Sequence, residues 1–195
     1  MKAHTAAGKL QGFKEDAPWY EAAFVVGITN AMNVVADAIA GSAAVAPLIA
    51  PLEPAACDKR TAALYEDIRS FYSSAEVPLA LRLIAHDAGY LEDFWQAVKR
   101  AFSDNRLPRR FKEALAFAVS LTTHSGFGTA FHLGEMRRLG VTEVGVREIL
   151  GVAQMFSSFT KIADVLALDA DMAEMAPVDW SPAPNGPPRT PGTGS

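Results

Sequence analysis

The sequence has almost no cysteine and no long basic run. A single cysteine, Cys57, stands among 195 residues, so the chain can form neither an internal disulfide nor an internal thiol pair. Lysine and arginine occur only in short runs such as Arg109-Arg110, and the net charge is −4 with a pI near 5.6. The sequence therefore has no basic patch of the kind that binds nucleic acid. Nothing requires an oxidising compartment, and we expect a cytoplasmic protein.

An uninterrupted membrane-length apolar run is also missing. The longest apolar stretch, residues 22–40, is broken by Asn30, Asn33 and Asp37. A membrane span needs few or no charges, so we predict a buried helix and no membrane contact. Strand-like alternation is absent as well, and with 50% hydrophobic residues the chain is expected to form one all-α body.

Composition divides the chain into four parts. Residues 1–17 mix charges and glycines without periodicity and are expected to be a flexible arm. Residues 18–56 hold a helix and a proline-rich linker, and residues 57–170 hold the main helical domain. Residues 176–195 are rich in Pro and Gly and are predicted to be disordered.

Apolar spacing and helix-end signals predict the individual helices. The expected caps are Asp58, Ser125 and Thr142, and the expected helix stops are Gly89 and Gly140. The predicted helices cover residues 19–40, 59–72, 79–86, 90–102, 108–123, 125–139 and 143–168.

Two of these helices resemble each other. Residues 21–40 align without gaps with residues 148–167, and identities fall at Glu21/Glu148, Val25/Val152, Ala36/Ala163, Asp37/Asp164 and Ala40/Ala167. Two amphipathic helices can match this well by chance. If the repeat is real, the first helix is the remnant of one repeat and the rest of the chain is a complete second one.

The candidate catalytic residues lie in the segment from Lys112 to His132. Glu113 is followed by Ser125 twelve residues on, by Gly128 three further and by His132 four further. A carboxylate and an imidazole on consecutive helices can act as general acid and base, or form a structural pair. His124 is a further candidate for the substrate pocket. Its spacing from His132 matches no standard metal site, so no metal or other cofactor is predicted.

Ser125 and Gly128 each have two interpretations. Ser125 lies seven residues, or about 10 Å, from His132, so activation as a nucleophile is disfavoured against a role as helix N-cap. Gly128 stands one turn before His132 on the same helix face. It leaves either a slot for a small substrate or room for a closely packed neighbour.

This spacing resembles the active-site segment of the alkylhydroperoxidase D and carboxymuconolactone decarboxylase superfamily. In that family a glutamate precedes a Cys-x-x-Cys and a histidine, and the positions of both cysteines hold Ser125 and Gly128 here. The resemblance implies an alkylhydroperoxidase D-like helical bundle and a homo-oligomer, for which Phe156 and Phe159 offer apolar surface.

Further segments resemble one branch of the superfamily, the group I 2-haloacid dehalogenases. They are Leu64-Tyr-Glu-Asp-Ile68, Arg82-Leu-Ile-Ala85 and Gly89-Tyr-Leu91 ahead of Trp95. The water-activating aspartate of that branch is expected just before Arg82, where this chain reads Val77-Pro-Leu-Ala-Leu81.

Three functions follow from these resemblances. The first is a non-thiol enzyme that uses Glu113 and His132 as acid and base on a small carboxylate, lactone or haloacid. The second is a hydroperoxide reductase, which the absence of a thiol pair disfavours. The third is a non-catalytic scaffold of the same fold, which the missing aspartate and the shortened first repeat favour.

Overall fold

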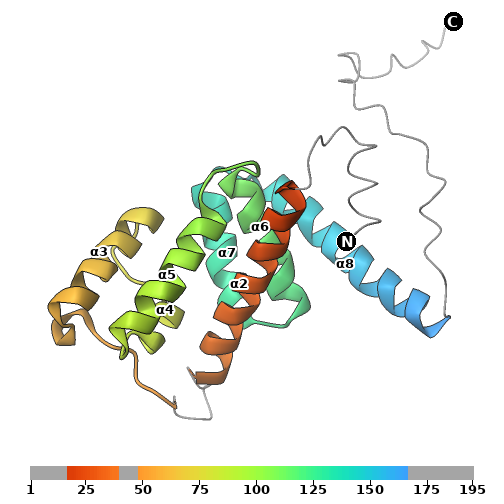
Figure 1. The fold of residues 1–195 in the computed structure, drawn as a ribbon. Helices are drawn as coiled ribbons and strands as arrows, with labels where there is room; N and C mark the ends of the chain where they lie inside the picture. Colours follow the sequence, from red (N-terminus) through yellow and green to blue (C-terminus); the bar gives the residue numbers. More distant parts are fainter. Residues whose placement is uncertain (1–16, 40–47, 167–195) are drawn as a thin grey trace, which may run out of the picture. The chain divides into compact units, whose positions relative to one another are not determined.

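The computed structural model describes residues 17–39 and 48–166, which are helical with no strand among them (Figure 1). The elements are α2 (Ala17–Ile39), a 3-10 turn η1 (Pro54–Ala56), α3 (Lys59–Tyr72), α4 (Leu79–Ile84), α5 (Ala88–Phe102), α6 (Arg109–Thr122), α7 (Gly126–Arg138) and α8 (Glu143–Val165). The all-α prediction is confirmed. Residues 1–16 of the predicted arm, the predicted helix end at residue 40 and the C-terminal tail lie outside the described residues, and Ala17 belongs to α2 rather than to an arm.

Three predicted caps are present. The Asp58 carboxylate accepts the backbone N–H of Thr61, and the Thr142 hydroxyl accepts that of Gly145. The Ser125 hydroxyl accepts the N–H of Gly128 at 3.0 Å, which confirms Ser125 as the N-cap of α7. Gly140 follows α7 with φ +81°, a backbone conformation that favours glycine.

The predicted boundary between α4 and α5 was wrong. The helix predicted for residues 79–86 ends at Ile84, and Gly89 lies in the first turn of α5 instead of closing α4. The cause is Asp87, whose carboxylate accepts the N–H groups of Gly89 and Tyr90 and so begins α5 two residues earlier than predicted.

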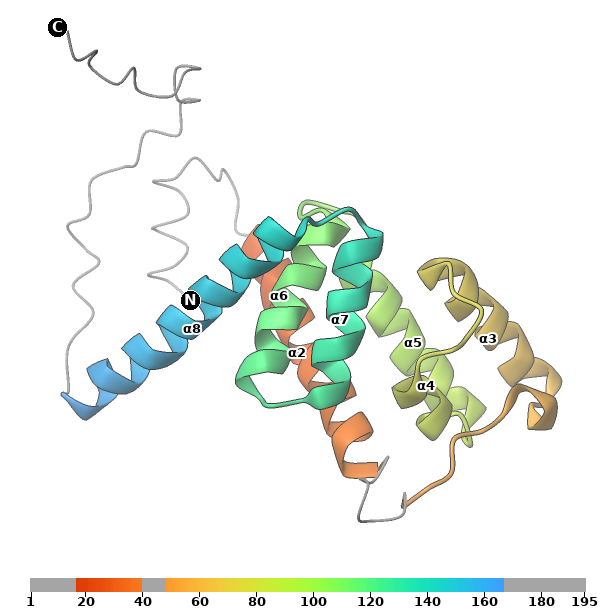
Figure 2. The same cartoon turned by 180° about the vertical axis from the view of Figure 1, so that it is seen from behind.

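Helix α2 lies within the bundle, against α4, α5, α6 and α7 (Figures 1 and 2). Among the described helices it is the one long and apolar enough to cross a membrane by length and composition. Its inner face is nevertheless buried protein core, formed by Val25, Ile28, Met32 and Ala36. The sequence predicted this burial but gave α2 no role in positioning other helices.

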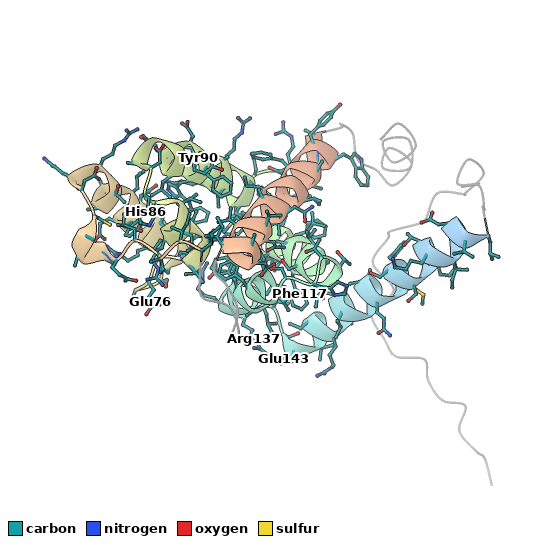
Figure 3. All side chains as sticks on the ribbon, turned by 90° about the horizontal axis from the view of Figure 1, so that it is seen from below. Glu76, His86, Tyr90, Phe117, Arg137 and Glu143 are labelled. Carbon is teal, nitrogen blue, oxygen red and sulfur yellow. The ribbon has the colours of Figure 1, made fainter. Side chains whose placement is uncertain are left out.

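The rest of the core joins α3, α4 and α5 to α6. Its largest buried side chains include Tyr65, Leu81, Leu91, Trp95 and Phe102. A second, smaller cluster of Phe117, Met136 and Val146 joins α6, α7 and the start of α8. Arg137 and Glu143, labelled in Figure 3, form an ion pair of 2.7 Å at the turn between α7 and α8.

Candidate functional site

Glu113 and His132 meet between α6 and α7, the most extensively packed pair of helices. The Glu113 Oε2 atom lies 2.8 Å from Nδ1 of His132, and the two side chains are 0% and 2% exposed. With Glu113 in its ionised form, the carboxylate can only accept, and Nδ1 is then the donor that carries the ring proton. Within the described residues no protein group bonds to Nε2, so this is the atom left to exchange a proton.

A partly buried arginine, Arg109, holds the carboxylate side of this pair. Arg109 lies one turn before Glu113, with its Nε 3.5 Å from Glu113 Oε1 and an Nη2 bond of 2.8 Å to Glu135. Its Nη1 donates to the Phe71 carbonyl at 2.9 Å, and its guanidinium lies 4.0 Å from the Phe71 ring centroid. Arg138 also donates to Glu135 through two bonds. Charge in this region is therefore paired rather than isolated.

Aromatic rings enclose the imidazole. Phe102 stacks on His132 with centroids 5.6 Å apart, and Phe131 meets it edge-on at 5.2 Å. Tyr72 contacts Phe131 in turn, also edge-on at 5.2 Å. Burial, and secondarily the nearby Glu113 charge, raise the pKa of Tyr72 well above its ordinary value, so the phenol stays neutral.

The space over Gly128 is filled. A Cβ placed on Gly128 would lie 2.1 Å from Oδ1 of Asn33 and 2.4 Å from Oγ of Ser120. The Asn33 amide comes from α2 and donates to Ser120 at 3.1 Å and to Thr123 at 3.3 Å. Of the two interpretations of Gly128, the structure therefore has the second, in which neighbouring side chains pack closely against the glycine. The interpretation as an open slot for substrate was wrong, because α2 supplies a side chain that the local sequence does not reveal.

The other candidate residues lie apart from the imidazole. Ser125 is buried and its hydroxyl is used for capping. His124 is exposed, has φ +59°, and lines a separate groove between α6 and α8. Within residues 17–39 and 48–166 no group of three or more His, Cys, Asp or Glu side chains could hold a metal ion.

Tyr72 and Phe131, which lie next to the imidazole, also line a cavity. Its volume is about 300 Å³, and Glu135, Arg82 and Phe127 also line it. Its wall includes Val77, Pro78 and Leu79, part of the segment of residues 77–81 in which the dehalogenase-like resemblance would require an aspartate. Neither Glu113 nor His132 lines this cavity.

The sequence analysis did not identify three groups at this site, Arg109, Glu135 and Asn33. Arg109 stands four residues before Glu113 and therefore lies on the same face of α6. Glu135 stands three residues after His132 and lies on the same face of α7. That spacing was visible in the sequence and could have identified them. Asn33 carried no such signal, because it lies 87 residues from Ser120.

The fold has a counterpart among solved structures. The crystal structure of the alkylhydroperoxidase AhpD core from Rhodospirillum rubrum ATCC 11170 matches with a TM-score of 0.60 and 22% sequence identity, covering 64% of this chain and 94% of that chain. This likeness establishes the fold class, an all-α, alkylhydroperoxidase D-like helical bundle, and confirms that prediction.

Part of the sequence also matches a family model. Residues 88–171 match the model of the carboxymuconolactone decarboxylase family, and this segment contains Glu113, Ser125, Gly128 and His132. This match spans less than half of the chain, and the structural likeness bears on the fold alone. No curated protein sequence matches it. The closer resemblance to haloacid dehalogenases gains no support from these comparisons.

Proposed function

We propose that the chain is a non-thiol enzyme that performs acid–base chemistry on a small carboxylate, lactone or haloacid. The observation that carries the proposal is the 2.8 Å contact between Glu113 and Nδ1 of His132, which leaves Nε2 without a protein partner among the described residues. His132 would take up or deliver a proton through Nε2. Glu113 would hold the ring orientation and stabilise the imidazolium that forms.

A match to the family model does not by itself define this chemistry. A hydroperoxide reductase of the thiol type needs two cysteines, and this chain has Cys57 alone. Burial raises the pKa of the Cys57 thiol, which disfavours the reactive thiolate. Acid–base chemistry requires only the two side chains that the bundle has brought together.

A substrate must also reach Nε2. His132 is 2% exposed and does not line the 300 Å³ cavity, whereas Phe131, which contacts the imidazole, and Tyr72 do. We propose that the cavity receives the substrate and that contact with the imidazole requires movement of Phe131. Phe131 is only partly buried, so it is less tightly enclosed than His132 itself.

A substrate screen with a matched pair of variants tests the proposal. The panel holds small lactones, 2-haloacids and decarboxylation-prone carboxylates, and turnover is followed by pH-stat titration. For any substrate found, His132→Gln should lower kcat/KM by about 10²–10⁴-fold, with helix content by circular dichroism unchanged. His124→Ala serves as the control, because this exposed imidazole lies in another groove and should leave turnover unchanged.

A second candidate is a non-catalytic scaffold. The observation that favours it is the packing of Asn33 against Gly128. This packing fills the space one turn before His132 where a small substrate could otherwise bind. Under this alternative the wild-type chain turns over no member of the panel, and His132→Gln changes only the free energy of unfolding. Such a result would overturn the enzymatic proposal.

A further inference from the structure

The hydroxyl of Tyr72 has no hydrogen-bond partner within the described residues. Tyr72 ends α3 and is 2% exposed, and its ring packs edge-on against Phe71 and Phe131, with centroids 5.2 Å apart in both pairs. Because burial, and secondarily the Glu113 charge, raise the pKa of Tyr72 well above its ordinary value, the phenol keeps its proton. A buried tyrosine usually places this proton in a hydrogen bond, and here residues 17–39 and 48–166 supply no acceptor.

This hydroxyl opens onto the cavity described above. Tyr72 lines the cavity of about 300 Å³, and its oxygen is not one of the fully sealed, unpartnered side-chain atoms of the described residues. Since the whole side chain is only 2% exposed, the open surface of the oxygen lies toward the cavity rather than toward bulk solvent. Glu135, whose charge acts on the phenol, lines the same cavity. A ligand in the cavity can therefore accept a hydrogen bond from Tyr72.

The charged side chains of the cavity wall leave no uncompensated positive charge among the described residues. Nη1 of Arg82 donates to both carboxylate oxygens of Glu53, at 2.9 and 3.0 Å, and the Nε of Arg82 is fully buried. Glu135 already pairs with two arginine side chains. Glu76, labelled in Figure 3, is exposed and forms no ion pair with the described residues. The uncompensated charge of the wall is therefore negative, which disfavours a carboxylate ligand.

We propose that Tyr72 is the hydrogen-bond donor for an uncharged carbonyl substrate, an ester or a cyclic ester that carries no carboxylate. The phenol holds the carbonyl oxygen, and apolar wall residues such as Val77, Pro78 and Phe127 enclose the rest of the molecule. A neutral donor stabilises the negative charge that develops on a carbonyl oxygen and needs no counter-ion. This role of Tyr72 rests on the proposed use of the cavity as the substrate site. It narrows the substrate from carboxylates, lactones and haloacids to the uncharged class.

Phe131 connects this donor with the imidazole. Its ring contacts both Tyr72 and His132 edge-on, with centroids 5.2 Å apart in each pair. The movement of Phe131 that the proposed function requires therefore exposes the imidazole beside the carbonyl group that Tyr72 holds. A cavity of about 300 Å³ has room for about ten water-sized groups, which is enough for a five- or six-membered ring.

Ligand titrations followed by amide chemical shifts test the substrate class. The full chain is titrated with γ-butyrolactone and, separately, with 4-hydroxybutyrate, the ring-opened carboxylate with the same carbon chain. We expect the dissociation constant of the lactone to be at least about tenfold lower, with shifts at residues 72–82 and 127–135. Three results would overturn the proposal: no binding of the lactone, equal or tighter binding of the carboxylate, or shifts confined to the groove between α6 and α8.

Tyr72→Phe removes the proposed donor and no other atom. Because the hydroxyl has no partner among the described residues, the unfolding midpoint should not change, whereas the dissociation constant of the lactone should rise about fivefold. Tyr90→Phe is the matched control, since Tyr90, also labelled in Figure 3, is 53% exposed on α5 and does not line the cavity.

Infrared difference spectra of the bound lactone, labelled with ¹³C at its carbonyl, give a readout that a merely structural tyrosine would not move. A hydrogen bond from a phenol lowers the carbonyl stretching frequency, and Tyr72→Phe should abolish this lowering while Tyr90→Phe retains it. If Tyr72→Phe leaves either the stretching frequency or the dissociation constant unchanged, the carbonyl does not accept from Tyr72 and the proposal fails.

Failure of the enzymatic proposal gives a different pattern of results. A chain that binds the lactone through Tyr72 but turns over no member of the substrate panel keeps the binding site and loses the enzymatic proposal. Turnover of a haloacid that His132→Gln abolishes, without binding of the lactone, keeps the acid–base chemistry and overturns the role of Tyr72.

Discussion

Replacing Gly128 by alanine tests the packing of α2 against α7. The added Cβ would lie 2.1 Å from Oδ1 and 3.0 Å from Cγ of Asn33, and 2.4 Å from Oγ of Ser120. Contacts this short force the Asn33 amide to move. Asn33 is 3% exposed and bonded to Ser120, so movement breaks a buried hydrogen bond.

The magnitude follows from three opposing contributions. Alanine gains at most about 1 kcal/mol over glycine in a helix. Overpacking costs about 1–3 kcal/mol, and a buried polar group left without its partner costs about 1–3 kcal/mol more. We therefore expect Gly128→Ala to lower the free energy of unfolding by about 2 kcal/mol, and Tm by about 4–8 °C for a body of this size.

A second glycine in the same helix provides the control. A Cβ on Gly134 would meet no atom within 4 Å, so Gly134→Ala should raise stability by up to about 1 kcal/mol. Urea unfolding followed by circular dichroism measures both variants, and Asn33→Ala combined with Gly128→Ala should recover part of the loss. If Gly128→Ala is as stable as Gly134→Ala, the space over Gly128 is open and the packing argument fails.

Three further predictions concern the cap, the partly buried Arg109 and the contact of Asp67 with Lys99 and Trp95. Ser125→Ala should cost about 1 kcal/mol in urea unfolding, because the N–H of Gly128 loses its acceptor, and an unchanged midpoint would refute the cap. Arg109→Lys keeps the charge but cannot bridge as many acceptors. It should lower stability by about 3 kcal/mol, and a loss below about 1 kcal/mol would show that Glu135 does not depend on it. Hydrogen bonds from Lys99 and then from Trp95 lower the pKa of Asp67, so its stabilisation is present above the unfolded pKa of about 4 and is lost as pH falls through the lower folded value. Asp67→Asn should therefore be less stable than wild type at pH 7 and approach it below about pH 4 in urea titrations, whereas a constant difference would contradict the assignment.

Local signals predicted much of the fold. Asp58, Ser125 and Thr142 were recognised as caps because a helix N-terminus is decided within four residues of the chain. The start of α5 was missed although Asp87 is equally local, since Gly89 was taken for a helix stop. The approach of Glu113 to His132 followed from family spacing rather than from any periodicity.

Long-range packing could not be predicted in the same way. The closure of the space over Gly128 depends on Asn33, which reaches it through the placement of α2 in the bundle. Composition indicated that α2 would be buried but not which helices it would contact. The buried pair of Lys112 with Glu21, 3.0 Å apart, is a second link of this kind between α6 and α2.

The central claim is that Glu113 holds His132 with Nδ1 protonated and Nε2 available. A long-range ¹H–¹⁵N correlation spectrum of the full chain measures the protonation of each ring nitrogen directly, with exposed His124 as an internal reference. We predict that neutral His132 is protonated at Nδ1 alone, since this atom donates to the carboxylate at 2.8 Å. Protonation at Nε2 alone would contradict this account, because the nitrogen assigned to proton exchange would then carry the ring proton and Nδ1 could not donate to Glu113.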